Sequence, residues 1–263
     1  MGLKILTWDV RDLNSSSRRT VVHKMLQFIR PPISMIQETK LMHCTSRDIK
    51  QICGYKNVGW TLQQSVGSKG GMLILWDRDL VEVSDSLVAE YTLSVLCTNK
   101  LDNFQWFLTS VYGPNNSVDR TEFWIELDTV YRYWTNLPWC IGGDFNKITK
   151  CSEKNNFKKI RRSMKKFKKF IVEHDLIDLP LKGDGYTWSN GQPNPVMCRL
   201  DRFLISPSLE QHYLFVTQLA KARPTSDHIP LLLDIFDPSW GPSPFRFEVM
   251  WFLENGFLQL LED

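Results

Sequence analysis

The chain has 263 residues, of which 43% are hydrophobic and 23% are charged. This composition supplies enough apolar side chains for a sizeable core, argues against intrinsic disorder, and at this length fits one large domain or two small ones. The formal net charge of +3 is too small to indicate a nucleic-acid partner by itself.

Apolar segments bounded by turn residues predict strands, and apolar residues spaced by three or four predict helices. In chain order, strands are expected at residues 3–8, 33–37, 72–76, 93–98, 104–112, 139–142, 186–189, 199–205 and 229–235. Helices are expected at residues 18–29, 121–134 and 157–171. Strands outnumber helices, and both hairpin-length and helix-length connections occur. This mixture favours a four-layer α/β/β/α sandwich, in which two mostly antiparallel sheets pack face to face between outer helices.

The chain shows no internal repeat, and residues 1–237 are expected to form one domain. Residues 238–263 are punctuated by proline, as in Gly241-Pro242-Ser243-Pro244, and then become rich in aromatic side chains. This pattern predicts a linker and tail leading into a segment that needs another surface on which to pack.

Cysteine usage and hydropathy indicate the compartment. The six cysteines are scattered, with neither a CxxC pair nor a zinc spacing, which predicts buried free thiols in a reducing environment. The first apolar stretch is short and is interrupted by Asp9, unlike a signal peptide. No apolar run approaches the roughly 20 residues that span a bilayer. We therefore expect a soluble intracellular protein without a membrane partner.

Positive charge is concentrated in one segment. Residues 158–169 hold eight Lys or Arg residues and no acid, so the rest of the chain is net acidic. The expected helix carries an apolar stripe, formed by Phe157, Ile160, Met164, Phe167 and Ile171, which leaves its cations on the other faces. A basic helix on an acidic body fits a polyanionic partner, and a solvated helix face is the alternative interpretation.

Polar motifs stand at the ends of five apolar segments. They are Ile36-Gln37-Glu38-Thr39, Val111-Tyr112-Gly113-Pro114, Gly142-Gly143-Asp144-Phe145-Asn146, Arg199-Leu200-Asp201-Arg202-Phe203 and Ser226-Asp227-His228-Ile229-Pro230. Each motif alone is compatible with a turn or a packed strand end. Together they supply carboxylates that can hold a hard cation or accept a proton from water, and donors that can face the charge on phosphate oxygens. This inventory suits metal-assisted cleavage of a phosphate ester.

With these motifs in this order, the chain resembles the endonuclease/exonuclease/phosphatase superfamily, the group of abasic-site endonucleases and DNase I. It is most similar to the endonuclease domain of plant LINE-type non-LTR retrotransposons. This likeness rests on five stretches, namely residues 37–40, 139–146, 186–190, 199–204 and 223–228. Residues 241–248 also resemble the junction that precedes reverse transcriptase in those elements.

The resemblance implies a role for each matching residue. Asp144 would orient and deprotonate the attacking water, and Asn146 would hydrogen-bond the scissile phosphate. Tyr112 would contact a phosphate oxygen. His228 would stabilise the pentacovalent phosphate, held in place by Asp201, since a paired carboxylate raises the pKa of an imidazole and fixes its tautomer.

The resemblance also implies a cation site. Glu38 would be the principal ligand, with Asp227 close to the same ion, and oxygen ligands suit Mg²⁺ or Mn²⁺. The first strand departs from the family pattern, because Asp9 stands where an Asn is expected and Asp12 where a Gly is expected. Asp9 would join the metal ligands, yet it cannot donate to Asp144 unless it is protonated, and it adds like-charge repulsion. Asp12 would strain its turn.

We therefore expect a monomeric, divalent-metal-dependent phosphodiesterase that nicks DNA in the nucleus and uses no small organic cofactor. The candidate DNA contacts are Lys158, Lys159, Arg161, Arg162 and Arg202. One alternative is a phosphatase of the same superfamily that acts on a small phosphoester. Another is a catalytically impaired nucleic-acid-binding relic, which the departure at Asp9 motivates.

Overall fold

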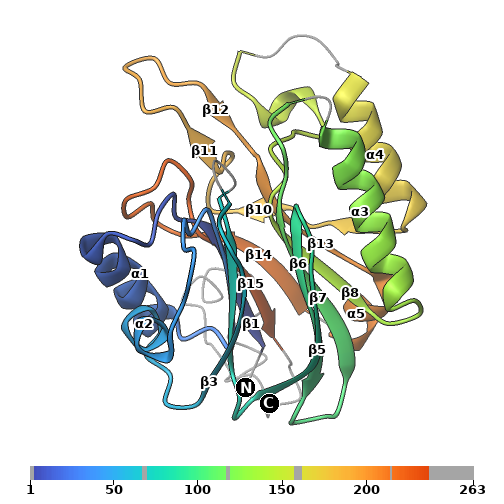
Figure 1. The fold of residues 1–263 in the computed structure, drawn as a ribbon. Helices are drawn as coiled ribbons and strands as arrows, with labels where there is room; N and C mark the ends of the chain where they lie inside the picture. The colour runs from blue at the N-terminus through green and yellow to red at the C-terminus, as the bar shows by residue number, and fades with distance from the viewer. Residues whose placement is uncertain (1–2, 67–69, 117–118, 157–161, 214, 237–263) are drawn as a thin grey trace, which may run out of the picture.

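In the computed structural model, two β-sheets pack face to face between outer helices (Figure 1). The structure describes residues 3–66, 70–116, 119–156, 162–213 and 215–236. The expected tail at residues 238–263 and residues 157–161, at the start of the expected basic helix, lie outside this part of the chain. Within it, no helix is long and apolar enough to cross a membrane.

The first sheet has seven strands in the order β10-β14-β15-β1-β2-β4-β3. Only the β10–β14 and β1–β2 pairs are parallel among its described strands. In that order the bounds are Leu181–Lys182, Phe215–Ala220, Leu231–Phe236, Lys4–Asp9, Ile33–Gln37, Met72–Asp77 and Val58–Gln63. The central strands are buried along nearly their whole length, as their apolar sequences predict.

The second sheet has six strands in the order β5-β6-β7-β8-β13-β9, and only β7–β8 is parallel among the pairs described. The bounds in that order are Val81–Val88, Thr92–Asn99, Gln105–Tyr112, Trp139–Asp144, Asp201–Ile205 and Ile177–Asp178. A short hairpin of β11 (Trp188–Ser189) and β12 (Met197–Cys198) projects beyond the sheets (Figure 1). The prediction of two mostly antiparallel sheets is therefore confirmed.

Helices cover the outer face of each sheet (Figure 1). Helices α1 (Ser16–Ile29) and α2 (Ser46–Ile52) lie on the first sheet, and α3 (Asp119–Tyr133) and α4 (Arg162–Glu173) lie on the second. A 3₁₀ turn, η1 (Cys151–Glu153), and α5 (Pro207–His212) complete the described helices. Apolar clusters fill the three interfaces between layers, as expected for a four-layer fold.

Two glycines at the end of β8 allow the sheets and strands to approach closely. A Cβ on Gly142 would lie 2.5 Å from Met35 of the opposite sheet. Gly143 has φ +139, and a Cβ there would lie 2.2 Å from the carbonyl oxygen of Val111. A larger residue would therefore displace the end of β8, where Asp144 lies.

Candidate active site

The predicted motifs meet in one pocket of about 300 Å³, where strands of both sheets end. Asp9 is the last residue of β1, and Glu38 directly follows β2. Tyr112 and Asp144 end β7 and β8 and are paired across those strands. His228 lies just before β15, and it also lines the pocket. The topology therefore brings together side chains that are up to 219 positions apart in the sequence.

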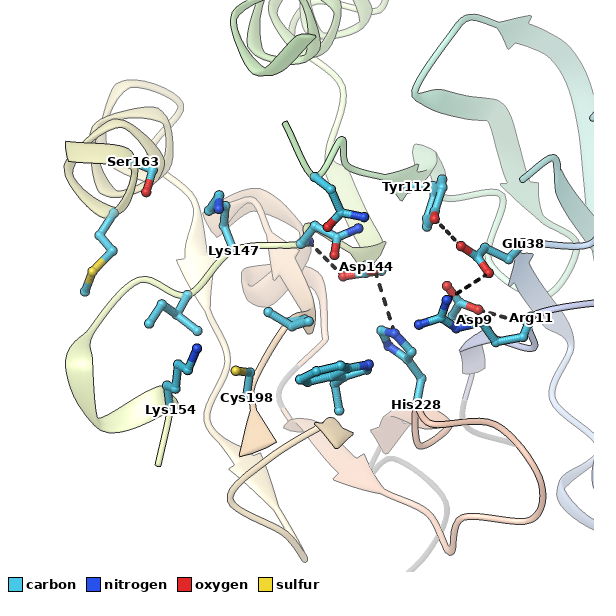
Figure 2. A pocket seen from close by; sticks show the side chains of 16 residues that line it. Asp9, Arg11, Glu38, Tyr112, Asp144, Lys147, Lys154, Ser163, Cys198 and His228 are labelled. Atoms are coloured by element: carbon cyan, nitrogen blue, oxygen red, sulfur yellow. Dashed lines mark hydrogen bonds and ion pairs between the residues drawn. The ribbon is translucent and has the colours of Figure 1, made fainter. Parts of the chain in front are cut away.

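Asp144, His228 and Asp201 form a buried chain of acid and base groups. The His228 ring lies 2.9 Å from Asp201 through Nδ1, and its Nε2 lies 4.0 Å from Asp144 Oδ2. Each of the three residues is at most 2% exposed. Asp201 can therefore fix the orientation of the imidazole, whose Nε2 faces Asp144 (Figure 2).

Burial and neighbouring charges shift the proton affinity of both reactive groups. Burial raises the pKa of Asp144, and the charge of Asp201 adds to this effect, bringing it to about 7. Burial by itself would lower the pKa of His228, but Asp201 and then Asp144 raise it to about 10. At neutral pH a cationic imidazole therefore lies beside a carboxyl group that readily gains or loses a proton.

Glu38 and Tyr112 are joined by a short hydrogen bond from the phenol to Glu38 Oε1 (Figure 2). Glu38 has φ 50, a left-handed conformation, and lies close to Gly70. Next to Tyr112 in the sequence, the carbonyl of Gly113 accepts the Asn146 amide (2.8 Å). These contacts hold an amide, a phenol and a carboxylate on the pocket wall.

Asp9 is almost fully buried, and only one of its two carboxylate oxygens has a hydrogen-bond partner among the described residues. Its Oδ1 accepts the backbone N–H of Arg11 (3.0 Å), while Oδ2 has no hydrogen-bond partner in the described part of the chain. Burial raises the pKa of Asp9 well above its usual value; His228 opposes this shift, and Glu38 and Asp144 reinforce it. The expected repulsion is thus present, although desolvation is the larger cause.

Asp227 is occupied by three side-chain donors, one of them the adjacent Ser226 hydroxyl (3.4 Å to Oδ1), instead of lying open. Arg11 donates to both of its oxygens (2.7 and 2.6 Å), and Trp188 Nε1 donates to Oδ2 (2.7 Å). Burial opposes ionisation, but these donors and His228 lower the pKa of Asp227. Its predicted contact with a metal stays a prediction.

The carboxylates in this pocket fit a hard divalent cation. Ligand atoms of Asp9, Asp144 and His228 lie within 4.8 Å of one another. The unpartnered, buried Oδ2 of Asp9 has the character of a metal ligand, because such an oxygen needs a compensating charge or donor. His228, however, is held as a cation by Asp201, so the carboxylates and not the imidazole suit the metal.

Arg202 requires a correction, because the structure places it away from any surface that could contact DNA. Its side chain is fully buried, where it forms ion pairs with Glu153 (3.0 Å) and Asp178 (2.6 Å). Adjacent strand residues point to opposite faces, so Asp201 and Arg202 lie on different sides of β13. The burial of Arg202 contradicts the predicted DNA contact, and the alternation along the strand could have indicated from the sequence that its side chain faces away from Asp201.

The turn after β1 also differs from expectation. The residue with positive φ is Arg11 (φ 66), whereas Asp12 is not among the described residues in that conformation. Asp12 instead accepts the backbone N–H of Asn14 (2.8 Å) and so stabilises the turn. The predicted strain at Asp12 is therefore wrong.

The basic helix is only partly described. Lys158, Lys159 and Arg161 lie outside the described residues, and Arg162 begins α4 with an exposed side chain. Met164, Phe167 and Phe170 form the buried face of the helix.

Sequence reasoning missed several residues that line the same pocket, among them Arg11, Lys147, Lys154, Ser163 and Trp188. They come from the turn after β1, the loop after β8, the start of α4 and the β11–β12 hairpin. Ser163 and Lys154 lie on the side of the pocket away from Glu38 (Figure 2). Two signals were available, namely the position of Arg11 two residues after Asp9 and that of Trp188 within residues 186–190. Neither indicates where the side chain points.

Comparisons with known proteins identify the family and the fold. The family model described as the endonuclease/exonuclease/phosphatase family matches residues 6–228. No curated protein matches the sequence.

Similar solved structures include nucleases and a phosphatase. The endonuclease domain of TRAS1, a telomere-specific non-LTR retrotransposon, is 15% identical with a TM-score of 0.69, covering 89% of this chain and 98% of its own. The AP endonuclease LMAP from Leishmania major is also 15% identical with a TM-score of 0.69, covering 90% and 88%. A mannosyl-6-phosphatase from Bacteroides thetaiotaomicron is 16% identical with a TM-score of 0.61, covering 89% and 100%. These structures share the fold, and the family match over residues 6–228 shows that the chain belongs to the endonuclease/exonuclease/phosphatase family.

Proposed function

We propose that the protein is a divalent-metal-dependent endonuclease of retrotransposon origin that nicks DNA by hydrolysis. The observation that carries this proposal is the pairing of Asp144, with a pKa of about 7, and a cationic His228 on one pocket wall. A base and a charge-stabilising donor are the two groups that hydrolysis of a phosphodiester requires from side chains. In this proposal the enzyme is a monomer and acts in the nucleus.

In this reaction Asp144 accepts the proton of the attacking water. Its carboxylate is oriented by the backbone N–H of Asn146 (2.7 Å), which leaves Oδ2 directed toward His228. His228 Nε2 donates to the phosphate oxygen on which negative charge develops, while Asp201 keeps the ring cationic and fixed. Such positioned donors cost no reorganisation at the moment of reaction.

Tyr112 and Asn146 would hold the phosphate against these groups. A bound Mg²⁺ or Mn²⁺ would be held by the carboxylates of Glu38 and Asp9, and by Asp227 when Arg11 does not bind it. The ion would polarise the phosphate and stabilise the leaving oxygen. The phenol of Tyr112 holds Glu38 in position, as the hydrogen bond between them indicates.

DNA is favoured over a small phosphoester by the basic surface beside the pocket. Ser163 and Met164 at the start of α4 line the pocket. The same helix exposes Arg162, Lys165, Lys166 and Lys168. A row of cations next to a reactive pocket can follow a phosphate backbone and adds little for a single phosphate monoester.

Nicking of supercoiled plasmid by purified protein with added Mg²⁺ tests the proposal, with Asp144→Asn as the control for contaminating nucleases. Conversion of the plasmid to the open circular form by native protein, but not by Asp144→Asn, supports an endonuclease. Hydrolysis of small phosphoesters without nicking would instead support the phosphatase. Retention of DNA without cleavage would support a binding relic, and either result would overturn the proposal.

A further inference from the structure

Arg11 places a guanidinium group between Asp227 and Glu38, two of the carboxylates expected to hold the metal. Figure 2 shows Arg11 beside Glu38. Its Nε and Nη2 donate to the two oxygens of Asp227, at 2.7 and 2.6 Å. Its Nη1 lies 3.6 Å from Glu38 Oε2. Each nitrogen of the guanidinium therefore faces a carboxylate, and the Asp227 contact has the strong bidentate geometry.

The backbone directs Arg11 toward this position. Arg11 lies two residues after Asp9, the last residue of β1, and has φ 66. Its N–H donates to Asp9 Oδ1 (3.0 Å), which fixes the turn. The side chain remains 42% exposed, so packing does not lock it in place and it can move without disturbing the core.

A divalent cation and this guanidinium need the same oxygens. Cations such as Mg²⁺ bind carboxylate oxygens directly, while both oxygens of Asp227 already accept N–H groups. Because Arg11 occupies one acceptor position on each oxygen, an ion that binds Asp227 competes with Arg11 for it. Competition of this kind lowers the apparent affinity of a site for the ion. The apparent affinity is the intrinsic affinity multiplied by the fraction of molecules in which the ligands are free.

We propose that Arg11 is a built-in competitor of the divalent cation, which withholds Asp227 from the metal and sets how tightly the site binds it. This inference rests on the proposed metal-dependent function. It differs from a role for Arg11 in binding the substrate phosphate, because the guanidinium is turned toward Asp227 and Glu38 and would have to leave both carboxylates to reach a phosphate.

Binding of Mn²⁺ without DNA tests the inference, followed by the electron paramagnetic resonance signal of the free ion. Arg11→Met removes the charge and the donors but keeps an unbranched side chain, and we expect Mn²⁺ to bind at least about tenfold more tightly. Arg223→Met is the matched control, since Arg223 is exposed four positions before Asp227 and forms no ion pair within the described residues. Equal affinity of Arg11→Met and native protein would overturn the inference.

The double variant Arg11→Met/Asp227→Asn identifies the route of the effect. If Arg11 acts by withholding Asp227, the tenfold gain should disappear when Asp227 can no longer bind as a carboxylate. A gain that persists in the double variant would show that Arg11 acts only through its charge, and the withholding step would be wrong. The melting temperature provides a second readout, because added Mn²⁺ should raise that of Arg11→Met more than that of native protein.

Plasmid nicking, measured separately, distinguishes the two proposals. Tighter Mn²⁺ binding by Arg11→Met in a protein that never nicks DNA would support the competitor and reject the endonuclease. Nicking by native protein, with Mn²⁺ affinity unchanged by Arg11→Met, would support the endonuclease and reject the competitor.

Discussion

In the proposed reaction Asp144 is the base, Glu38 is a metal ligand and His228 is a donor. Each of these side chains can be replaced separately. We expect Asp144→Asn to lower the nicking rate by about 10²- to 10⁴-fold, because it removes the proton acceptor. His228→Ala removes a charge-stabilising donor and should cost roughly 10²- to 10³-fold. Glu38→Ala should abolish most cleavage at limiting Mg²⁺. Initial nicking rates of variants with unchanged circular dichroism check these values, and native activity in Asp144→Asn would contradict the assignment of the base.

Asp9 provides a second test at this scale. Because the pKa of Asp9 is raised, its proton persists to higher pH than usual, and the protonated form can donate to Asp144 as an amide would. As pH rises and Asp9 loses that proton, a second negative charge appears beside the base. We therefore expect Asp9→Asn to nick DNA faster than native protein, with a ratio of rates that grows as pH rises through the raised pKa of Asp9.

Measuring both proteins at saturating Mg²⁺ over that pH range decides the question, because two interacting carboxyl groups titrate as a pair. A bound cation reduces the repulsion, and Asp9→Asn also removes an expected metal ligand, so saturating Mg²⁺ keeps the effect on the base separate from an effect on metal binding. Superimposable profiles would show that Asp9 is a tolerated substitution and would remove the reason to suspect an impaired enzyme.

The sequence could predict the motifs of the site but not every contact between them. Asp144, Asp201 and His228 stand beside strand ends, and the structure brings them together. The bridge from Arg11 to Asp227 joins residues 216 positions apart and depends on a left-handed turn that no local pattern requires. Which donors occupy a carboxylate is a tertiary property, so this contact could not be read from spacing.

At the scale of elements, the strands that sequence reasoning identified are mostly the buried ones. The strands that were missed are β3, β5, β14 and the two-residue strands β9, β10 and β12. Of the longer ones, β3 and β5 lie at the edges of their sheets, and β14 is mostly only partly buried. β5 alternates between partly buried and exposed residues, including charged ones, which weakens the apolar signal. Helix α2 was missed because its seven residues are too few for a convincing period.

The prediction for helix α4 concerns contacts between its exposed cations and DNA. Its described cations lie opposite a buried face, so neutralising them should leave the fold unchanged. If Arg162 and Lys166 each contact a phosphate, replacing either with Gln should reduce the slope of log K against log salt concentration by about 0.9. Fluorescence anisotropy with duplex DNA at several salt concentrations measures this slope, and Lys169→Gln is the control, because Lys169 already pairs with Glu173. Unchanged slopes would favour a solvated helix face.

At the scale of the whole molecule, a buried group of charges joins segments that are distant in the sequence. Glu153 from η1 pairs with Arg202 of β13 (3.0 Å) and with Arg199 (3.3 Å), and Asp178 of β9 pairs with both arginines. Arg202 is fully buried, and Glu153 is 3% exposed. Removing one member of such a group leaves an uncompensated charge in the interior, which costs more than the intact group contributes.

We therefore expect Glu153→Gln to lower the free energy of unfolding at neutral pH by about 3–5 kcal/mol. Burial alone would raise the pKa of Glu153, but the charge and hydrogen bonds of Arg202 lower it below its ordinary value of 4.5. A group whose pKa is depressed by folding stabilises the protein above its ordinary pKa and loses that contribution as pH falls through the depressed value. The difference between native protein and Glu153→Gln should thus be largest at neutral pH and shrink in acid, as urea unfolding at several pH values would show. Glu173→Gln, which removes an exposed pair with Lys169, should change stability by less than about 1 kcal/mol at every pH. A difference for Glu153→Gln that did not vary with pH would mean that packing, not charge, accounts for its effect.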